Sequence, residues 1–312
     1  MNSLASQPTL KIITWNVNGI RAFAKKLSLG GNFKTLISDQ KPDVVCFQEI
    51  KIDNSLVDQF TDFLGPEYPF SNFNCCTVKK GYSGTAIFSK EKPISVRTDF
   101  PLNTEGRVLV TEFESCIVIN TYVPNSGMNG DRLEYRTKVW DVAFRKYLNL
   151  LDSESSKPVI WTGDMNVAHG DNDIYNPKKK RNKAPGFNDS ERENLGLILG
   201  GVGNITEIQR SKRTLMLGRP GPTIYELPKP PFIDAFAMLH GNWEDSILEG
   251  YKPKRRATFW SYRFKAKERD NGWRIDYFIV SDRLSNRILQ CEVFEEYHGL
   301  SDHCPLMLEF RK

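Results

Sequence analysis

Short apolar segments bordered by clusters of polar residues are the feature of this sequence that most constrains its fold. Three clusters follow such a segment and a fourth precedes the last one: Asn16 with Asn18, Gln48-Glu49, Gly163-Asp164-Met165-Asn166, and Ser301-Asp302-His303-Cys304. An α/β protein builds a site in this way, because groups distant in sequence meet where strands end. The pattern therefore predicts one site assembled from both ends of the chain.

The spacing of the apolar residues predicts the strands. Segments that are short, rich in β-branched or aromatic residues and bounded by turn residues are expected to be strands. Eight segments fit this description: residues 10–17, 44–48, 85–89, 108–113, 116–123, 159–162, 274–281 and 304–310. Several of them are apolar almost throughout, as strands buried on both faces are.

Helix-period stretches lie between these segments. The clearest covers residues 131–151, where apolar side chains recur on one face: Leu133, Trp140, Phe144, Leu148 and Leu151. Another is expected to begin near Asn188, with Ser190 and Glu193 at the spacing of a capping box. Apolar strands mixed with amphipathic helices predict an α/β fold, a layered sandwich of sheets covered by helices.

The length and patterning favour one domain. The chain has 312 residues, and its apolar patterning continues to Phe310. We expect a flexible segment over residues 1–8 and a single domain over residues 9–312. Residues 200–231 are rich in glycine and proline and show little periodicity, so a surface insertion is expected there.

The N-terminal region and the cysteines indicate an intracellular protein. The first eight residues contain no apolar region of the signal-peptide type, and no apolar run approaches membrane-spanning length. The six cysteines are expected to be reduced thiols, several of them in the core. Cys75 and Cys76 have no second pair at metal-site spacing, which argues against a structural zinc.

The charge balance is mildly basic, with 43 Lys and Arg against 38 Asp and Glu and a formal net charge of +5. Basic residues concentrate in four runs: residues 178–183, 210–213, 252–256 and 263–269. Such runs fit a polyanionic partner. The run at 178–183 has two other interpretations, a solvated loop and a nuclear localisation signal.

Seven motifs carry a resemblance to a known family: Trp15-Asn16-Val17-Asn18-Gly19, Gln48-Glu49, Gly81-Tyr82-Ser83-Gly84, Tyr122-Val123-Pro124-Asn125, Gly163-Asp164-Met165-Asn166-Val167-Ala168-His169, Trp273-Arg274-Ile275-Asp276-Tyr277 and Ser301-Asp302-His303-Cys304-Pro305. From about residue 10 onward the chain resembles the exonuclease III family of apurinic/apyrimidinic (AP) endonucleases.

The resemblance implies a four-layered sandwich, in which two mixed β-sheets pack face to face between layers of helices. It also implies a metal-dependent phosphodiesterase that cleaves duplex DNA on the 5′ side of an abasic site. The products would be a 3′-hydroxyl and a 5′-deoxyribose phosphate. The family often also trims blocked or mismatched 3′ ends, so 3′–5′ exonuclease and 3′-phosphodiesterase activities are expected.

Phosphodiester hydrolysis requires a nucleophilic water, neutralisation of the non-bridging oxygens and help for the departing 3′ oxygen. Mg²⁺, or Mn²⁺ as a substitute, supplies the last two with only one or two carboxylate ligands. The resemblance implies that Glu49 and Asp302 lie near the ion. Asn18 stands where some members of the family have Asp, and its neutral amide oxygen makes it an outer or weak ligand.

The resemblance also implies the proton-transfer groups. His303 and Asp276 resemble an imidazole and carboxylate pair in which the acid fixes the ring's orientation and tautomer. Two residues, His303 and Asp164, are then alternative general bases, and His303 has the further alternative of binding the scissile phosphate as an imidazolium. Contacts with the nucleophile or the phosphate are implied for Asn166, Asn16 and Tyr122. Tyr122 has the further alternative of ionising near the metal.

The family pattern also indicates how DNA is bound. An abasic sugar flipped from a duplex is small and apolar, and the walls of its pocket map onto Phe259, Trp273 and Ile275. Contacts with the sugar-phosphate backbone, which carry affinity and little sequence information, map onto Arg21, Lys51, Tyr82, His169, Asn176 and Lys178. Residues that wedge into the duplex map onto Met128 and Arg263.

These assignments have alternatives. The same fold class includes inositol polyphosphate phosphatases, sphingomyelinases and RNA deadenylases, which share the Glu, Gly-Asp-x-Asn and Ser-Asp-His features. A non-catalytic binding module on the same scaffold is a second alternative, although none of the expected catalytic groups is missing. Phe259 and Trp273 are also plausible as core aromatics.

The expected partner is double-stranded DNA that contains abasic sites or blocked 3′ ends. Other base-excision-repair proteins are further candidate partners, whereas a membrane is not. We expect a monomer, located in the nucleus of a eukaryote or in the cytoplasm of a bacterium.

Overall fold

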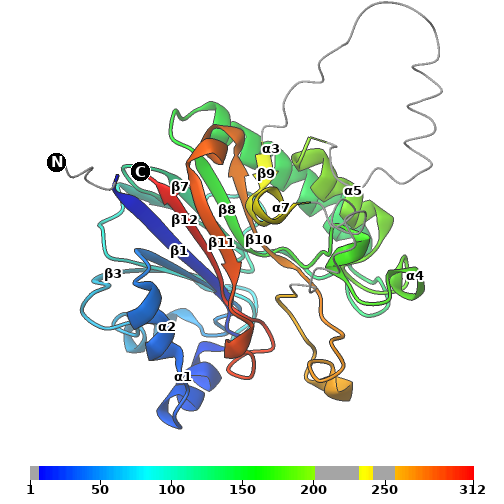
Figure 1. The fold of residues 1–312 in the computed structure, drawn as a ribbon, viewed down its shortest axis with the longest axis horizontal. Coiled ribbons are helices and arrows are strands. Elements are labelled where there is room, and N and C mark those ends of the chain that lie inside the picture. Colours follow the sequence, from blue (N-terminus) through cyan, green and yellow to red (C-terminus); the bar gives the residue numbers. More distant parts are fainter. Residues whose placement is uncertain (1–6, 201–231, 242–256) are drawn as a thin grey trace, which may run out of the picture.

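The computed structural model describes residues 7–200, 232–241 and 257–312, which form two six-stranded β-sheets and their flanking helices (Figure 1). The first sheet has the strand order β11 (Ile288–Val293), β12 (Leu306–Arg311), β1 (Thr9–Asn16), β2 (Val44–Gln48), β4 (Thr85–Ser89) and β3 (Phe70–Asn74). The second has the order β5 (Ser95–Arg97), β6 (Val108–Glu112), β7 (Ile117–Tyr122), β8 (Val159–Asp164), β10 (Asp276–Ser281) and β9 (Phe232–Asp234).

Both sheets are mixed. In the first, β1 pairs parallel to β2 and antiparallel to β12. In the second, β7 pairs parallel to β8, which in turn pairs antiparallel to β10. The carboxyl ends of β1, β2, β7 and β8 and the amino ends of β10 and β12 are therefore placed to meet at one end of the sandwich.

Successive residues of each central strand face different apolar layers, because side chains alternate across a sheet. Ile12 packs between the sheets with Val118 and Ile160 of the second sheet. Its neighbour Ile13 packs on the other face, in the cluster that contains Phe23. The central strands are thus buried on both faces, which explains why their sequences are apolar almost throughout.

Helices cover the outer face of each sheet (Figure 1). The α-helices are α1 (Ile20–Ser28), α2 (Phe33–Gln40), α3 (Asp141–Ser153), α4 (Pro177–Lys180), α5 (Asp189–Ile198) and α7 (Ala235–His240). A π-helical stretch, η2 (Tyr135–Trp140), leads into α3, and short 3-10 helices occur at η1 (Asn54–Gln59), η3 (Asp171–Asp173), η4 (Arg263–Lys265), η5 (Asp282–Arg287) and η6 (Glu295–Tyr297). Helices α1 and α2 pack on the first sheet, and α3 and α5 pack on the second.

The predicted four-layered α/β sandwich is confirmed, as are all eight predicted strands to within a few residues. Four strands were not predicted, β3, β5, β9 and β11, and each lies at an edge of its sheet. An edge strand has one neighbour and is partly exposed, so its sequence is mixed and gives a weak apolar signal.

The helix predictions need two corrections. The region predicted as one helix over residues 131–151 is helical from Leu133 to Ser153, and its part Tyr135–Trp140 is π-helical. The predicted capping box of Ser190 and Glu193 is wrong, because Glu191 accepts the backbone N–H of Asn188 at 3.1 Å and the helix begins at Asp189. Both polar pairs have the same spacing, so the sequence alone left the choice open.

Some predictions fall where the structure gives no description. The expected surface insertion lies outside the described residues apart from Gly200, and so do most of the expected N-terminal segment and the basic runs at 210–213 and 252–256. Within the described ranges, no helix combines the length and the apolar character needed to cross a bilayer. All six cysteines are free and buried.

Gly163 lies where β7 and β8 approach each other closely. A Cβ atom added to Gly163, which has φ +125°, would lie 2.0 Å from the backbone oxygen of Thr121. We predict that Gly163→Ala lowers the free energy of unfolding by about 2 kcal/mol or more, as judged by urea denaturation. The matched control is Gly65→Ala, with φ +84° and open space around the added methyl, which should cost only about 1 kcal/mol. Equal losses would show that the close approach is not what requires glycine at position 163.

Candidate active site

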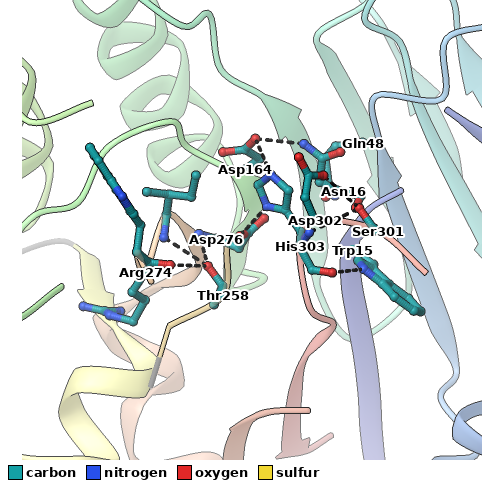
Figure 2. A network of polar contacts seen from close by, with 12 residues as sticks. Trp15, Asn16, Gln48, Asp164, Thr258, Arg274, Asp276, Ser301, Asp302 and His303 are labelled. Carbon is teal, nitrogen blue, oxygen red and sulfur yellow. Dashed lines mark hydrogen bonds and ion pairs between the residues drawn. The ribbon is translucent and has the colours of Figure 1, made fainter. Parts of the chain in front are cut away.

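The polar clusters of the sequence meet at one end of the sandwich, because the strand directions bring them there. Asn16 ends β1 and pairs with Gln48 at the end of β2. Asp164 ends β8 and pairs across the second sheet with Asp276 at the start of β10. His303 comes just before β12, which runs antiparallel to β1. The predicted convergence of these groups is therefore present (Figure 2).

His303 lies between two carboxylates (Figure 2). Its Nδ1 is 2.8 Å from Oδ2 of Asp276, and its Nε2 is 3.8 Å from Oδ2 of Asp164. Burial by itself disfavours the imidazolium, but the charges of Asp276 and Asp164 outweigh it and raise the pKa of His303 to about 10. These carboxylates therefore favour the imidazolium form, with one ring nitrogen directed at Asp164.

Both oxygens of Asp164 are held in place. Asn16 Nδ2 donates to Oδ2 at 2.9 Å, and the backbone N–H of Asn166 donates to Oδ1 at 2.8 Å. Burial raises the pKa of Asp164 to about 7, with Asp276 and Glu49 acting in the same direction and the charge of His303 opposing them. A carboxyl group with such a pKa can exchange a proton near neutral pH.

Glu49 and Asp302 lie on the other side of Asn16 and are linked through Asn18 and Lys51. Glu49 Oε1 accepts from Asn16 Nδ2 at 2.9 Å, and Glu49 Oε2 forms an ion pair with Lys51 Nζ at 2.7 Å. The same ammonium donates to Asn18 Oδ1, and Asn18 Nδ2 donates to Asp302 Oδ1 at 3.0 Å. Burial opposes ionisation of Glu49, but Lys51 and the hydrogen bonds outweigh it and lower the pKa of Glu49.

Two groups of side chains could hold a metal ion. Asp164, Asp276 and His303 each offer a ligand atom, and these atoms lie within 4.8 Å of one another. The predicted group is Glu49, Asp302 and Asn18. Its donors are all oxygens, and Glu49 Oε2 and Asn18 Oδ1 already converge on the cationic amine of Lys51. This donor set fits a hard divalent ion.

Several residues at this end of the sandwich have left-handed backbone conformations. Asn18, Glu49 and Asn166 have φ values of 49°, 51° and 49°, and Lys51 has 52°. Such conformations cost of order 1–3 kcal/mol each and often occur at functional sites. Hydrogen bonds oppose this strain, among them those from the backbone N–H of Gly19 to Glu49 O at 2.7 Å and from that of Lys51 to Ser83 O at 2.9 Å.

Tyr122 ends β7 and pairs with Asp164 across the parallel strands. Burial, followed by the charge of Glu49, raises the pKa of Tyr122 well above its usual value. These surroundings favour the protonated hydroxyl, which can act as a hydrogen-bond donor.

An apolar cluster adjoins the imidazole. Phe259, Trp273 and Ile275, the three predicted pocket walls, pack together with Ala168, Ile174 and Phe187. The rings of Phe259 and His303 have centroids 4.8 Å apart. The predicted pocket residues are thus together, and they lie next to the polar site.

The predicted DNA contacts have different surroundings. Five are exposed: Arg21, Met128, Asn176, Lys178 and Arg263. Lys51 and Tyr82 are half-buried. His169 is only 7% exposed and lies against Gly196 of α5, so its side chain does not fit the predicted direct contact with DNA.

Three residues that position the site were not identified from the sequence. Thr258 Oγ1 accepts the backbone N–H groups of Ile275 and Asp276, both at 3.1 Å. Ser301 Oγ donates to the backbone oxygen of Asn16 at 2.6 Å. Arg107 is buried and donates to the backbone oxygen of Tyr122 at 3.0 Å. Ser301 belongs to one of the motifs, so the sequence could have indicated its role. Thr258 and Arg107 lie outside the motifs, and nothing in the sequence sets them apart.

Comparisons with known proteins agree with this geometry. Residues 13–303 match the model of the endonuclease/exonuclease/phosphatase family. The chain is 36% identical over 302 residues to the exodeoxyribonuclease of Bacillus subtilis, covering 96% of this chain and 98% of that protein. It is 33% identical over 304 residues to the DNA repair nuclease APEX1 of Danio rerio, covering 96% and 81%.

Solved structures show the same fold. The AP endonuclease LMAP from Leishmania major has a TM-score of 0.74 and 28% identity, and the match covers 98% of this chain and 89% of that one. An AP endonuclease from Archaeoglobus fulgidus has a TM-score of 0.70 and 28% identity, with 97% and 100% covered.

The chain therefore belongs to the endonuclease/exonuclease/phosphatase family. Within that family it groups with the exonuclease III-type exodeoxyribonucleases and AP endonucleases of DNA repair, which confirms the resemblance carried by the motifs.

The ion pair of His303 and Asp276 generates a prediction about the charge of the ring. We predict that Asp276→Asn lowers the pKa of His303, because the carboxylate at 2.8 Å is a main stabiliser of the imidazolium. An NMR titration of the histidine ring protons measures the shift. His240, whose Nε2 lies 2.8 Å from the backbone oxygen of Cys291 in β11, is the internal reference. A pKa of His303 that stays the same in the variant would contradict the assigned pair.

Proposed function

We propose that this protein is a Mg²⁺-dependent AP endonuclease. It hydrolyses the phosphodiester on the 5′ side of an abasic site in duplex DNA and leaves a 3′-hydroxyl and a 5′-deoxyribose phosphate. The observation that supports this best is the contact of Phe259 with His303. It sets an apolar cluster beside the charged groups, as required if a flipped abasic sugar is to lie next to its own phosphodiester.

Asp164 is suited to the role of general base. The water that attacks phosphorus must lose a proton, and Asp164 is a buried carboxyl whose orientation is fixed by Asn16 and Asn166. His303 is the alternative base, but its Nδ1 is bonded to Asp276 and the carboxylates favour its cationic form. We therefore assign His303 to binding a non-bridging phosphate oxygen through Nε2.

Other polar groups around the phosphate are donors. The hydroxyl of Tyr122 is kept protonated by its surroundings and can donate to a phosphate oxygen. The Asn16 amide is already bonded to Glu49 and Asp164, so it acts mainly by holding these two carboxylates apart at fixed positions. Asn166 was predicted to contact the nucleophile or the phosphate; its Nδ2 donates to the backbone oxygen of Val123 at 2.8 Å, so we assign it a holding role as well.

Glu49 and Asp302, with Asn18 as a weaker ligand, are the residues we propose to hold Mg²⁺. Bound there, the ion would neutralise charge on the phosphate and stabilise the departing 3′ oxygen. The other group includes the imidazole of His303, whose Nδ1 is bonded to Asp276, whereas the Glu49 group offers only the oxygen donors that Mg²⁺ prefers. We therefore assign that group to proton transfer and phosphate binding.

Processing of 3′ ends is the second activity that we propose. A blocked 3′ terminus presents the same phosphodiester chemistry without a flipped sugar, and the bacterial relative is named an exodeoxyribonuclease. The balance between the two activities depends on how well the cluster of Phe259, Trp273 and Ile275 accepts an abasic sugar. We expect the protein to act as a monomer on DNA, in the nucleus of a eukaryote or the cytoplasm of a bacterium.

A gel assay with several substrates tests the function. The substrates are an abasic duplex, a 3′-phosphate, a 3′-mismatch, an RNA strand and an inositol polyphosphate, each with Mg²⁺ and with a chelator. We expect incision of the abasic duplex in Mg²⁺, and a loss of at least about 100-fold in His303→Ala and Asp164→Asn with folding retained. Glu49→Ala should require more Mg²⁺ for the same rate.

Three outcomes of the same assay would contradict the proposed function. Release of phosphate from the inositol polyphosphate with an intact abasic duplex would replace the DNA-repair assignment by the phosphatase alternative. Full turnover by a correctly folded His303→Ala variant would show that the site is misassigned. Binding of DNA without cleavage of any substrate would favour the non-catalytic alternative.

The exposed lysines among residues 178–183 predict that binding to DNA weakens as the salt concentration rises. Each lysine that contacts a phosphate releases counterions from the DNA. The logarithm of the association constant for abasic duplex therefore falls as the logarithm of the salt concentration rises. We predict that Lys178→Ala weakens binding and reduces the slope by about 1. Lys146→Ala, which removes an exposed lysine from α3, is the matched control and should leave the slope as it is. An unchanged slope in Lys178→Ala would remove this residue from the DNA surface.

A further inference from the structure

Arg107 is a buried, fully paired arginine that the catalytic roles above do not use. It is 1% exposed. Its Nε forms an ion pair with Glu105, its Nη1 donates to the backbone oxygen of Tyr122 at 3.0 Å, and its Nη2 donates to the hydroxyl of Tyr82 at 2.9 Å. Burying a guanidinium is costly unless it is well paired. The three groups that pair with Arg107 therefore fix the position of its guanidinium.

One side of the guanidinium holds Tyr122. Its Cζ lies 4.6 Å from the centroid of the Tyr122 ring, a distance at which a cation and an aromatic face attract. The backbone oxygen of Arg107 also accepts the N–H of Tyr122 at 2.9 Å. Arg107 thus contacts the ring of Tyr122 and both hydrogen-bonding groups of its backbone. The direction of the Tyr122 hydroxyl depends on these contacts.

The other side holds Tyr82. The Tyr82 hydroxyl accepts from Arg107 and also from Arg132 Nη1 at 3.0 Å, while Arg132 Nη2 forms an ion pair with Glu105 at 3.2 Å. A tyrosine hydroxyl has two acceptor positions and one proton. Both acceptor positions are used here, so the hydroxyl can add only a bond in which it donates.

The charged groups around Tyr82 determine which kind of acceptor its hydroxyl proton favours. Two guanidinium groups adjoin the hydroxyl, and the ammonium of the exposed Lys79 lies 5.1 Å from the centroid of the ring. Glu105, which pairs with both guanidinium groups, offsets one of these three positive charges. The remaining positive charge favours an anionic acceptor, and a backbone phosphate of DNA is the anion that the proposed substrate supplies.

We propose that Arg107 is a positioning residue that couples a DNA phosphate contact at Tyr82 to the orientation of Tyr122 at the scissile phosphodiester. The coupling rests on the proposed function of the site. A phosphate of a correctly seated duplex accepts the proton of Tyr82, which completes the hydrogen bonds of the hydroxyl that Arg107 holds. The same guanidinium then holds Tyr122 in the direction needed to donate to the reacting phosphate.

Double-mutant cycles test the coupling. Arg107→Lys keeps the charge and loses the planar set of donors. We expect it to lower kcat for abasic duplex by at least about 10-fold in the otherwise unchanged protein. In a Tyr122→Phe background the same change should lower kcat by less than about 2-fold, because the hydroxyl that Arg107 orients is gone. A second cycle, with Tyr82→Phe and KM as the readout, should be non-additive in the same way.

A merely structural arginine would behave differently. It would lower kcat by the same factor in the presence and absence of the Tyr122 hydroxyl, and additive effects in both cycles would overturn the proposal. The control is Arg283→Lys, since Arg283 also pairs with a carboxylate and backbone oxygens but lies beyond the other end of β10. It should leave kcat and KM unchanged.

Two replacement experiments cover the cases in which these cycles cannot be carried out. If Arg107→Lys does not fold, as judged by circular dichroism and thermal unfolding, Glu105→Gln replaces it in both cycles, because it removes the ion pair of Arg107 and retains the arginine. If the unaltered protein does not incise abasic duplex, the proposed function fails first. The same cycles on 3′-mismatch trimming then decide the role of Arg107 separately.

Discussion

One side-chain amide joins the two halves of the site. Asn16 Nδ2 donates to Glu49, which follows a strand of the first sheet, and to Asp164, which ends a strand of the second. These bonds hold the two carboxylates at fixed positions in a buried region where like charges would otherwise repel. The site is therefore a property of how the two sheets pack, and the apolar layer between them sets the distances among its groups.

The sequence predicted the parts of the fold that are buried. All the central strands were identified, because a strand covered on both faces must be apolar almost throughout. The four edge strands were not, and β3 shows why, since every residue of Phe70–Asn74 is only partly buried. The polar groups of the site were identified because polar residues that interrupt apolar segments stand out.

The arrangement around those groups could not be predicted in the same way. The register of β8 against β10 sets Asp164 opposite Asp276, and no local pattern reveals a pairing between strands so far apart in the chain. The left-handed backbone of Glu49 and Lys51 is equally hidden, because neither residue type favours that conformation. Arg107 was missed because its role depends on Tyr82 and Tyr122, which are separated from it in the sequence and meet it only when the chain folds.

The position of β12 has a consequence for how activity arises as the protein folds. This strand lies between β1 and β11, and the indole of Trp15 donates to the backbone oxygen of His303 across 288 residues of sequence. Contacts between residues so distant in sequence slow the folding of a chain. His303 is held beside Asp164 only when β12 is paired with β1, so the site is complete only in a chain whose two ends have come together.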